Sequence, residues 1–279
     1  FTISATTGVL GVAKALDFET KASYTLTVRV TDTGVPALFH EVAVAVAVTN
    51  ANEAPTVTPG QERSVTENTA EGTAVAGSTL AFTDPDADDS ATWSIVAGNE
   101  GAFSIDAAGE LTVENTNMLN YEARTSFLLT VRVTDAGGSY GEGSLTVNIH
   151  DANEAPVFAE DAPSVRSIPE GLASGTLVGP PVSASDVDNG QSLTYTIVSQ
   201  PSGNHWAIDA ATGQLSANGQ VPALTNAPDP VKYDLVVRAT DDFTFQLATD
   251  QAVEVWVTDQ NDAPVFPDAA RTVAENSAS

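Results

Sequence analysis

Acidic residues recur in short, similar strings along this sequence, and they are the side chains best suited to chemistry. Glu67 stands in VTEN, Asp84 and Asp86 stand in DPDADD, and Asp186 and Asp188 stand in DVDNG. Calcium prefers oxygen ligands of this kind, about six to eight of them for each ion. Two carboxylates about 5 Å apart repel each other by roughly 3 kcal/mol at an effective dielectric constant of about 20. Because a bound cation turns this repulsion into attraction, the recurring acids predict calcium sites.

Other metals are not expected from the residues. The sequence has no cysteine, so a thiolate site for zinc or copper is excluded. Its histidines, His40, His150 and His205, stand at unrelated positions. The string DPDADD resembles the opening of an EF-hand loop, but the sixth position is Asp89 instead of Gly and the twelfth is Ile95 instead of Glu. The predicted calcium sites are therefore not EF-hands.

The acids could also be catalytic groups. Glu67 and Asp151, for instance, could form the paired carboxylates of a glycosidase. The sequence contains no nucleophile elbow, phosphate-binding loop or metalloprotease motif, and its pattern indicates no cleft-forming fold. We therefore predict no catalytic residues and a protein that is not an enzyme.

Composition narrows the function classes further. The chain has 279 residues, with 10 Lys and Arg against 37 Asp and Glu, which gives a formal net charge of -27. So acidic a chain excludes nucleic-acid binding through phosphate neutralisation. The longest apolar run, residues 42–48, is much shorter than the roughly 20 residues that a membrane-spanning helix needs. We expect no membrane insertion within these residues.

Several strings return in the same order and indicate internal repeats. NANEAP at residues 50–55 returns as DANEAP at 151–156 and as DQNDAP at 259–264, about 100 residues apart each time. Each is preceded by a copy of one longer string, and the three copies read YTLTVRVTD, FLLTVRVTD and YDLVVRATD. The expected units are a partial repeat at 1–55, complete repeats at 56–156 and 157–264, and the start of a further repeat at 265–279.

Apolar and polar residues alternate within each repeat, as in half-buried antiparallel strands. Tyr24, Leu26, Val28 and Val30 form one face of such a strand, and the threonines and Arg29 between them form the other. Units of about 100 residues made of short strands and turns predict an all-β fold of tandem Greek-key β-sandwiches in a linear array. We expect the apolar stripes of residues 1–55 to be poorly packed, because their partner strands would precede residue 1.

The three tryptophans differ in their expected exposure to solvent. The alternation places Trp93 and Trp206 in the cores of their repeats. Trp256 has the opposite parity from Val255 and Val257, so it is expected on the outer face of its strand. An exposed tryptophan is typical of a sugar-binding platform. Polysaccharide binding is therefore kept as an alternative.

The ordered set of motifs V-x-E-N, D-x-D, L-[DN]-[FY]-E, V-T-D and D-x-N-[DE]-A-P-V-F resembles the cadherin family, in particular its bacterial members. The resemblance covers essentially the whole chain. It implies Ig-like β-sandwiches joined end to end, with several calcium ions at each junction. The ligands there come from the base of one repeat, from the linker and from the top of the next repeat.

Matching the family's motifs to this sequence assigns the implied calcium ligands to three junctions. The first junction comprises Asp17, Glu19, Asn50, Asn52, Glu53, Asp84, Asp86 and Asp135. The second comprises Glu67, Asn120, Glu122, Asp151, Asn153, Glu154, Asp186, Asp188 and Asp241. The third comprises Glu170, Asp259, Asn261 and Asp262.

Three departures from the family's pattern affect these sites. Asn50 and Asn120 stand where the pattern has Asp, and each substitution removes a negative charge, which weakens calcium binding. In the third repeat TNAPDP, residues 225–230, replaces the string that carries Glu122 in the second. The linker strings NEAP and NDAP are one residue shorter than the NDNAP linker of the family's animal members. The alternative to calcium binding is that the acids in DPDADD and DVDNG only stabilise turns. Asp88 and Asp89 are expected to be solvated.

The resemblance implies a calcium-rigidified adhesion or stalk segment at a cell surface, outside the cell and anchored through parts beyond this chain. Its partners would be calcium ions and another cell-surface protein, with homophilic binding included. Two other functions stay open at this point. The chain could belong to a polysaccharide-binding protein, or it could be a passive spacer in a large secreted protein.

Overall fold

The structure, a computed structural model, describes residues 1–77, 79–86, 90–159, 164–188, 190–224 and 230–261. The chain forms two compact units, Phe1–Ala152 and Asn153–Ser279. In the described part there are strands and loops, with one 3₁₀ turn, η1 (Thr116–Met118). A helix of membrane-spanning length and apolar character is absent from these described residues.

The first unit begins with two antiparallel strand pairs. These are β1 (Thr2–Ile3) with β2 (Leu10–Gly11), and β3 (Ser23–Thr31) with β4 (Phe39–Ala47). The β3–β4 hairpin is paired along its whole length. Its apolar face is nevertheless exposed to solvent, with Val30 67% and Val42 53% exposed. The expectation of poor packing in this segment is confirmed.

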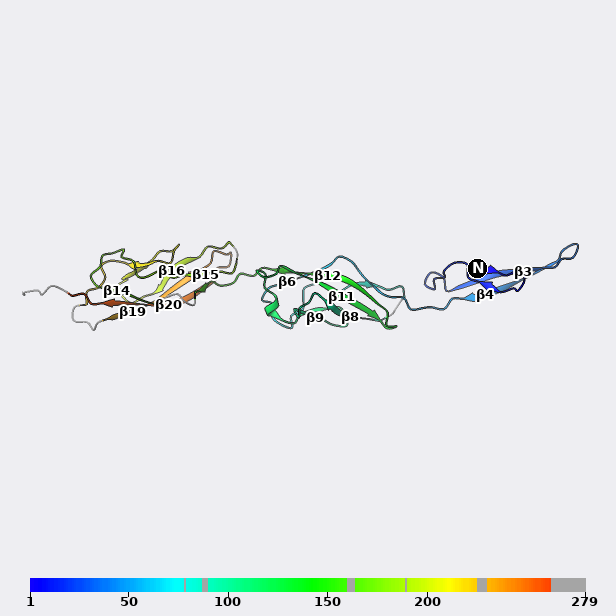
Figure 1. The fold of residues 1–279 in the computed structure, drawn as a ribbon, viewed down its shortest axis with the longest axis horizontal. Coiled ribbons are helices and arrows are strands. Elements are labelled where there is room, and N and C mark those ends of the chain that lie inside the picture. Colours follow the sequence, from blue (N-terminus) through cyan, green and yellow to red (C-terminus); the bar gives the residue numbers. More distant parts are fainter. Residues whose placement is uncertain (78, 87–89, 160–163, 189, 225–229, 262–279) are drawn as a thin grey trace, which may run out of the picture. The chain divides into compact units, whose positions relative to one another are not determined.

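A four-stranded sheet organises the next repeat (Figure 1). Its strands in spatial order are β6 (Gln61–Thr66), β12 (Tyr140–His150), β11 (Ser126–Asp135) and β8 (Ala91–Ala97). β6 runs parallel to β12, and the other neighbours are antiparallel. The alternation predicted from the sequence buries every second residue of β11 on one face of this sheet.

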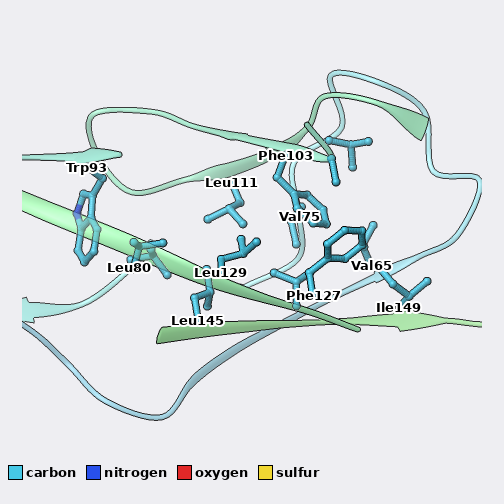
Figure 2. Packing of buried hydrophobic residues seen from close by; sticks show 14 of the residues in the cluster. Val65, Val75, Leu80, Trp93, Phe103, Leu111, Phe127, Leu129, Leu145 and Ile149 are labelled. Carbon is cyan, nitrogen blue, oxygen red and sulfur yellow. The ribbon is translucent and has the colours of Figure 1, made fainter. Parts of the chain in front are cut away.

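Short strands form the other side of this sandwich. They pair as β5 (Thr56–Val57) with β7 (Phe82–Thr83), and as β9 (Phe103–Ile105) with β10 (Leu111–Val113). Figure 2 shows the core between the two sides, where Phe103 from β9 faces Phe127 from β11. Their rings meet edge to face with centroids 5.2 Å apart, a favourable aromatic geometry. The repeat therefore has its own closed apolar core.

The second unit repeats this topology. Its four-stranded sheet has the order β14 (Val165–Pro169), β20 (Ala248–Thr258), β19 (Val231–Thr240) and β16 (Thr194–Ser199). The short pairs are β13 (Val157–Phe158) with β15 (Ala184–Ser185), and β17 (Trp206–Ile208) with β18 (Leu215–Ala217). The core is again separate, with Trp206 as its largest fully buried side chain.

The predicted fold class, all-β with tandem Ig-like sandwiches, is confirmed. Trp93 and Trp206 lie in their cores, 7% and 2% exposed. Turns at residues 107–109 and 211–213 connect β9 to β10 and β17 to β18. The repeat boundaries stay a prediction, and residues 265–279, expected to begin a further repeat, lie outside the described residues.

Candidate metal centre

Three acids converge at one end of the four-stranded sheet in the first unit. Glu67 directly follows β6, and Asp151 directly follows β12. Because these strands run parallel with Thr66 opposite His150, both acids leave the sheet at the same end. Glu122, from the loop before β11, joins them. One carboxylate oxygen from each of the three acids lies within 4.8 Å of the others.

Glu67 also has a structural role at this end of the sheet. The residue is only 3% exposed. Its Oε1 accepts a hydrogen bond from the backbone N–H of Ala152 at 2.9 Å, and its Oε2 accepts one from Tyr121 at 2.8 Å. Hydrogen bonds to a charged acceptor are stronger than neutral ones. Glu67 therefore fastens the loop before β11 and the segment after β12 to the end of β6.

Asp86 anchors a second cluster in the first unit. It follows β7 and is 8% exposed. Its Oδ1 accepts a hydrogen bond from Asn50 Nδ2 at 2.7 Å, and its Oδ2 accepts one from the backbone N–H of Glu53 at 2.8 Å. The Asn50 amide, followed by the Glu53 N–H, holds the pKa of Asp86 below its ordinary value. Asp86 is thus kept ionised while tied to the segment that precedes β5.

Asp135, the last residue of β11, makes a similar attachment. It is 6% exposed, and its Oδ2 accepts a hydrogen bond from Asn52 Nδ2 at 3.0 Å. Its Oδ1 accepts one from the backbone N–H of Ser139 at 2.8 Å. Asp84 Oδ1 accepts a bond from the N–H of Asp86 at 3.0 Å. The predicted acids thus meet the predicted asparagines through side-chain hydrogen bonds.

Glu19 and Glu53 add negative charge beside Asp86. One carboxylate oxygen from each of these three residues lies within 4.8 Å of the others. Desolvation, followed by repulsion from Glu19, Asp86 and Asp17, raises the pKa of Glu53 above its ordinary value. A cation at this place would reverse the repulsion. The cluster therefore has the electrostatic character expected of a cation site.

The second unit contains nearly the same network. The Oδ2 of Asp188 accepts a hydrogen bond from the backbone N–H of Glu154 at 2.9 Å, and Asp186 Oδ1 accepts one from the N–H of Asp188 at 3.1 Å. Asn153 Nδ2 donates to Asp241 Oδ2 at 2.9 Å. These contacts correspond one by one to those of Asp86, Asp84 and Asp135. Two repeats of different sequence therefore build the same acidic arrangement.

Several carboxylate oxygens in these networks are buried and receive no hydrogen bond from the described residues. They are Asp84 Oδ2, Asp186 Oδ2 and Asp188 Oδ1. Burial, followed by repulsion from Asp188 and Asp241, raises the pKa of Asp186. A buried acceptor without a donor is costly unless something else supplies positive charge. Calcium fits these residues, because it binds carboxylate oxygens and needs no hydrogen-bond donor.

Glu170 in the second unit is placed as Glu67 is in the first, directly after the strand that runs parallel to the last strand of the repeat. Glu170 is 6% exposed, and it accepts backbone hydrogen bonds from Leu224 and, at 2.8 Å, from Gln260. The Leu224 N–H, then the Gln260 N–H and the Asp259 side chain, hold the pKa of Glu170 below its ordinary value. Asn261 is exposed. Asp262, the remaining predicted ligand, and Asp88 and Asp89, predicted to be solvated, lie outside the described residues.

Two predicted ligands are engaged in local turns. Asp17 accepts hydrogen bonds from the backbone N–H of Thr20 at 2.9 Å and from its hydroxyl at 2.7 Å. These bonds to Thr20 hold the pKa of Asp17 below its ordinary value. Asn120 Oδ1 accepts from the backbone N–H of Ala123 at 2.6 Å, at the equivalent place in the second repeat. Both residues therefore shape the turn that carries Glu19 or Glu122.

Gln191 was not predicted from the sequence. Its Nε2 donates a hydrogen bond to Asn153 Oδ1 at 2.9 Å. Nothing in a single glutamine of a turn string indicates such a contact, which depends on how two loops approach each other.

Trp256 lies on the outer face of β20, as its parity predicts. It stands opposite Lys232 of β19 and Ser167 of β14. Its indole Nε1 donates to Glu254 Oε2 at 3.1 Å, and the residue is half-buried. These neighbours hold the ring within the sheet surface. Polysaccharide binding at this place stays a prediction.

Comparison with known proteins decides the family. The family model described as Cadherin domain matches residues 1–49, 61–150 and 164–258. The chain belongs to the cadherin family. Its matched segments contain the hairpin of the first repeat and the four-stranded sheets of the other two. The motifs that resembled cadherin repeats in the sequence thus identified the family correctly.

The similar curated cadherins are animal proteins of much greater length. Protocadherin Fat 1 of Homo sapiens is 30% identical over 276 residues, which cover 95% of this chain and 6% of that protein. The protocadherin-like wing polarity protein stan of Drosophila melanogaster is 34% identical over 275 residues, which cover 93% of this chain and 7% of that protein. The chain therefore spans less than a tenth of these relatives.

Solved cadherin structures share the fold of this chain. Mouse cadherin-23 EC22-24 has a TM-score of 0.66 at 24% identity, covering 88% of this chain and 78% of that one. Mouse protocadherin-24 EC1-3 has a TM-score of 0.68 at 20% identity, covering 93% of this chain and 86% of that one. The tandem β-sandwich architecture is therefore that of cadherin repeats.

Proposed function

We propose that this chain is a calcium-stiffened segment of an adhesion protein or stalk outside the cell. The observation that carries the proposal is the set of buried carboxylate oxygens on Asp84, Asp186 and Asp188 that receive no hydrogen bond. Membership of the cadherin family supports the same function. In this proposal the chain is not an enzyme, and the acids at the repeat ends are calcium ligands.

The hydrogen bonds of these acids explain how ion binding could stiffen the chain. Asp86 and Asp135 hold the segment before β5 through Asn50, Asn52 and the N–H of Glu53. In the second unit, Asp188 and Asp241 hold Glu154 and Asn153 in the same way. Bound calcium supplies the positive charge that these acids lack. The acids then no longer repel one another, and each linker segment stays hydrogen-bonded to them.

Calcium concentration would set the state of the segment. Extracellular calcium modules bind with dissociation constants on the order of 10⁻⁴–10⁻³ M. A ligand that binds the folded state stabilises it by mass action. We therefore propose that the sites are filled outside the cell, where the linkers are stiff. At low calcium, repulsion among carboxylates such as Glu19, Glu53 and Asp86 leaves the linkers flexible.

Small-angle scattering during a calcium titration tests the proposal. We expect the maximum dimension to rise, and the spread of sizes to narrow, as calcium increases. The double substitution Asp186→Ala with Asp188→Ala should blunt this response, because it removes two acids that carry unpartnered oxygens. A profile that is the same in calcium and in EDTA for the unsubstituted chain would disprove calcium stiffening.

The matched control removes the same charge elsewhere in the same repeat. Asp234→Ala with Asp250→Ala removes two carboxylates that form ion pairs with Lys232 and Arg238 on the surface. We expect this control to keep the full calcium response. Adhesion is tested separately with beads that carry the chain. Clustering in calcium supports adhesion, whereas stiffening without clustering supports a spacer.

A further inference from the structure

A pocket in the second unit contains more oxygen acceptors than the predicted ligands supply. Its volume is about 390 Å³. Asp186, Asp188, Gln191 and Tyr195 contribute to its lining. The first two are predicted calcium ligands, and Tyr195 belongs to β16. Gln191 is the unassigned polar side chain that shares this space with them.

The Gln191 side chain is held at one end. Its Nε2 donates a hydrogen bond to Asn153 Oδ1 at 2.9 Å. Asn153 is itself fixed, since its Nδ2 donates to Asp241 Oδ2 at 2.9 Å and to the Phe245 carbonyl at 3.3 Å. Gln191, Asn153 and Asp241 thus form a chain of hydrogen bonds. The orientation of both amide groups is set by this chain.

The other end of Gln191 lacks a donor. Its Oε1 is buried and accepts no hydrogen bond from the residues that the structure describes, and the same holds for Asp186 Oδ2 and Asp188 Oδ1. Asp188 is only 7% exposed, and the three acceptor atoms themselves are shielded from solvent. Buried polar atoms are nearly always paired in native proteins. Three buried acceptors around one pocket, with no donor among them, indicate a place for a cation.

We propose that Gln191 is an additional calcium ligand, whose Oε1 binds the ion held by Asp186 and Asp188. The neutral amide adds an oxygen without adding charge, and its hydrogen bond to Asn153 aims that oxygen before the ion arrives. This inference rests on the proposed calcium sites. It adds a ligand that the family's motifs, matched to this sequence, do not include.

Calcium titration calorimetry on the whole chain tests this ligand. Gln191→Ala should weaken one class of sites about tenfold or more, since removal of even an outer-shell partner of a metal ligand typically costs about 10–100-fold in metal affinity. Gln191→Glu places a charged oxygen at the same position and should strengthen binding, because added ligand charge raises calcium affinity. Ser192→Glu is the matched control, since it adds the same charge at the neighbouring, exposed position.

The outcomes separate the possible roles of Gln191. Weaker binding in Gln191→Ala, with Gln191→Glu binding more tightly than Ser192→Glu, supports direct ligation. Equal weakening in Gln191→Ala and Gln191→Glu overturns it, because Gln191 then acts only through its bond to Asn153. Unchanged binding in both variants also overturns it. A chain that binds no calcium even without substitution instead disproves the proposed function.

Terbium luminescence gives a second measurement that does not depend on affinity. Tyr195 lines the pocket and can sensitise a lanthanide bound there. Lifetimes in H₂O and D₂O report how many water molecules coordinate the ion. If Gln191 is a ligand, Gln191→Ala should gain a coordinated water relative to the unsubstituted chain. An unchanged water count under saturating terbium would contradict direct ligation.

Discussion

Strands β3 and β11 carry nearly the same residues, YTLTVRVTD and FLLTVRVTD, yet their surroundings differ. Both pair antiparallel with the following strand in the same register, so that Arg29 faces Glu41 and Arg132 faces Glu142. Val30 in β3 is 67% exposed, whereas the equivalent Val133 in β11 is 0% exposed. The difference arises because β11 also pairs with β8 and faces the core.

This comparison separates two properties of a strand. Alternation and the hairpin turn decide that the strand forms and how it is registered. The same alternation decides which face could be buried, but burial itself requires partner strands from elsewhere in the chain. Equivalent substitutions in the two strands should therefore have unequal effects.

The largest difference is expected for the apolar face. Val133→Ala should lower the free energy of unfolding by about 2 kcal/mol, because it removes two buried methyl groups and leaves a cavity. Val30→Ala should change it by less than about 0.5 kcal/mol, as is usual for exposed positions. Chemical denaturation of each variant measures both values. Equal losses would show that the β3 face is buried in solution.

The next difference is expected for the aspartate at the end of each repeated string, Asp32 just after β3 and Asp135 at the end of β11. Asp135 is buried and accepts hydrogen bonds from Asn52 and Ser139, whereas Asp32 is exposed and accepts from Gly34 and Leu38. Asp135→Ala in EDTA should cost about 2 kcal/mol, since it removes two hydrogen bonds to a buried, charged acceptor. Asp32→Ala should cost about 0.5 kcal/mol. Thermal unfolding without calcium measures both losses. A larger loss of stability in Asp32→Ala than in Asp135→Ala would refute this account.

Asp241, the equivalent of Asp32 and Asp135 in the third repeat, predicts a pH dependence of stability. Burial opposes ionisation of Asp241, but hydrogen bonds from Asn153, Leu247 and Phe243 outweigh it and hold its pKa below the ordinary value. A lowered folded-state pKa contributes stability above the unfolded-state pKa, and this stability is lost as pH falls through the folded-state pKa.

Asp241→Asn should therefore flatten the acid limb of the stability curve. The measurement is unfolding of the chain in EDTA at a series of pH values below neutrality. Asp250→Asn is a useful reference, because Arg238 lowers the pKa of Asp250 on the exposed face of the same sheet, where salt screens the effect. At high salt, the change in slope should persist for Asp241→Asn and fade for Asp250→Asn. Loss of both changes at high salt would argue against a buried network around Asp241.

How far the sequence predicts this molecule depends on whether a feature is local. Alternation in Tyr24–Thr31 and its copies predicts strands, faces and core positions, and Trp93 and Trp206 lie where it places them. It does not predict Arg166, a core-facing residue of β14 that is 4% exposed and donates to the Pro180 carbonyl. Burial lowers the pKa of this arginine.

The candidate site also has one part that the sequence predicts and one part that it does not. The acids themselves recur in the sequence, so Glu67 and Asp151 could be predicted, and their convergence follows once β6 and β12 are known to be parallel. The contact between Gln191 and Asn153 joins two loops whose approach is set by packing. A single sequence contains no spacing rule for such a contact. Calcium binding by any of these residues stays a prediction.

The smallest expected difference lies on the outer face of the hairpins. Arg132 forms an ion pair with Glu142 at 2.6 Å, and its guanidinium lies over the Tyr140 ring, 4.1 Å from the centroid. The equivalent Arg238 pairs with Asp250 at 2.7 Å, but Ala248 occupies the position of Tyr140. Exposed ion pairs contribute about 0.2–1 kcal/mol, and an exposed cation–π contact adds roughly 0.5–1 kcal/mol.

Double-mutant cycles resolve these two contributions. The Arg132–Glu142 and Arg238–Asp250 cycles should give similar, small coupling energies, and both should shrink in high salt because the groups are exposed. The Arg132–Tyr140 cycle should retain more of its coupling, since the contact depends on the ring and not on a second full charge. Introducing Ala248→Tyr should then create a comparable coupling with Arg238. Failure of that substitution to couple would mean that the arginine–aromatic contact depends on more than the shared cross-strand register.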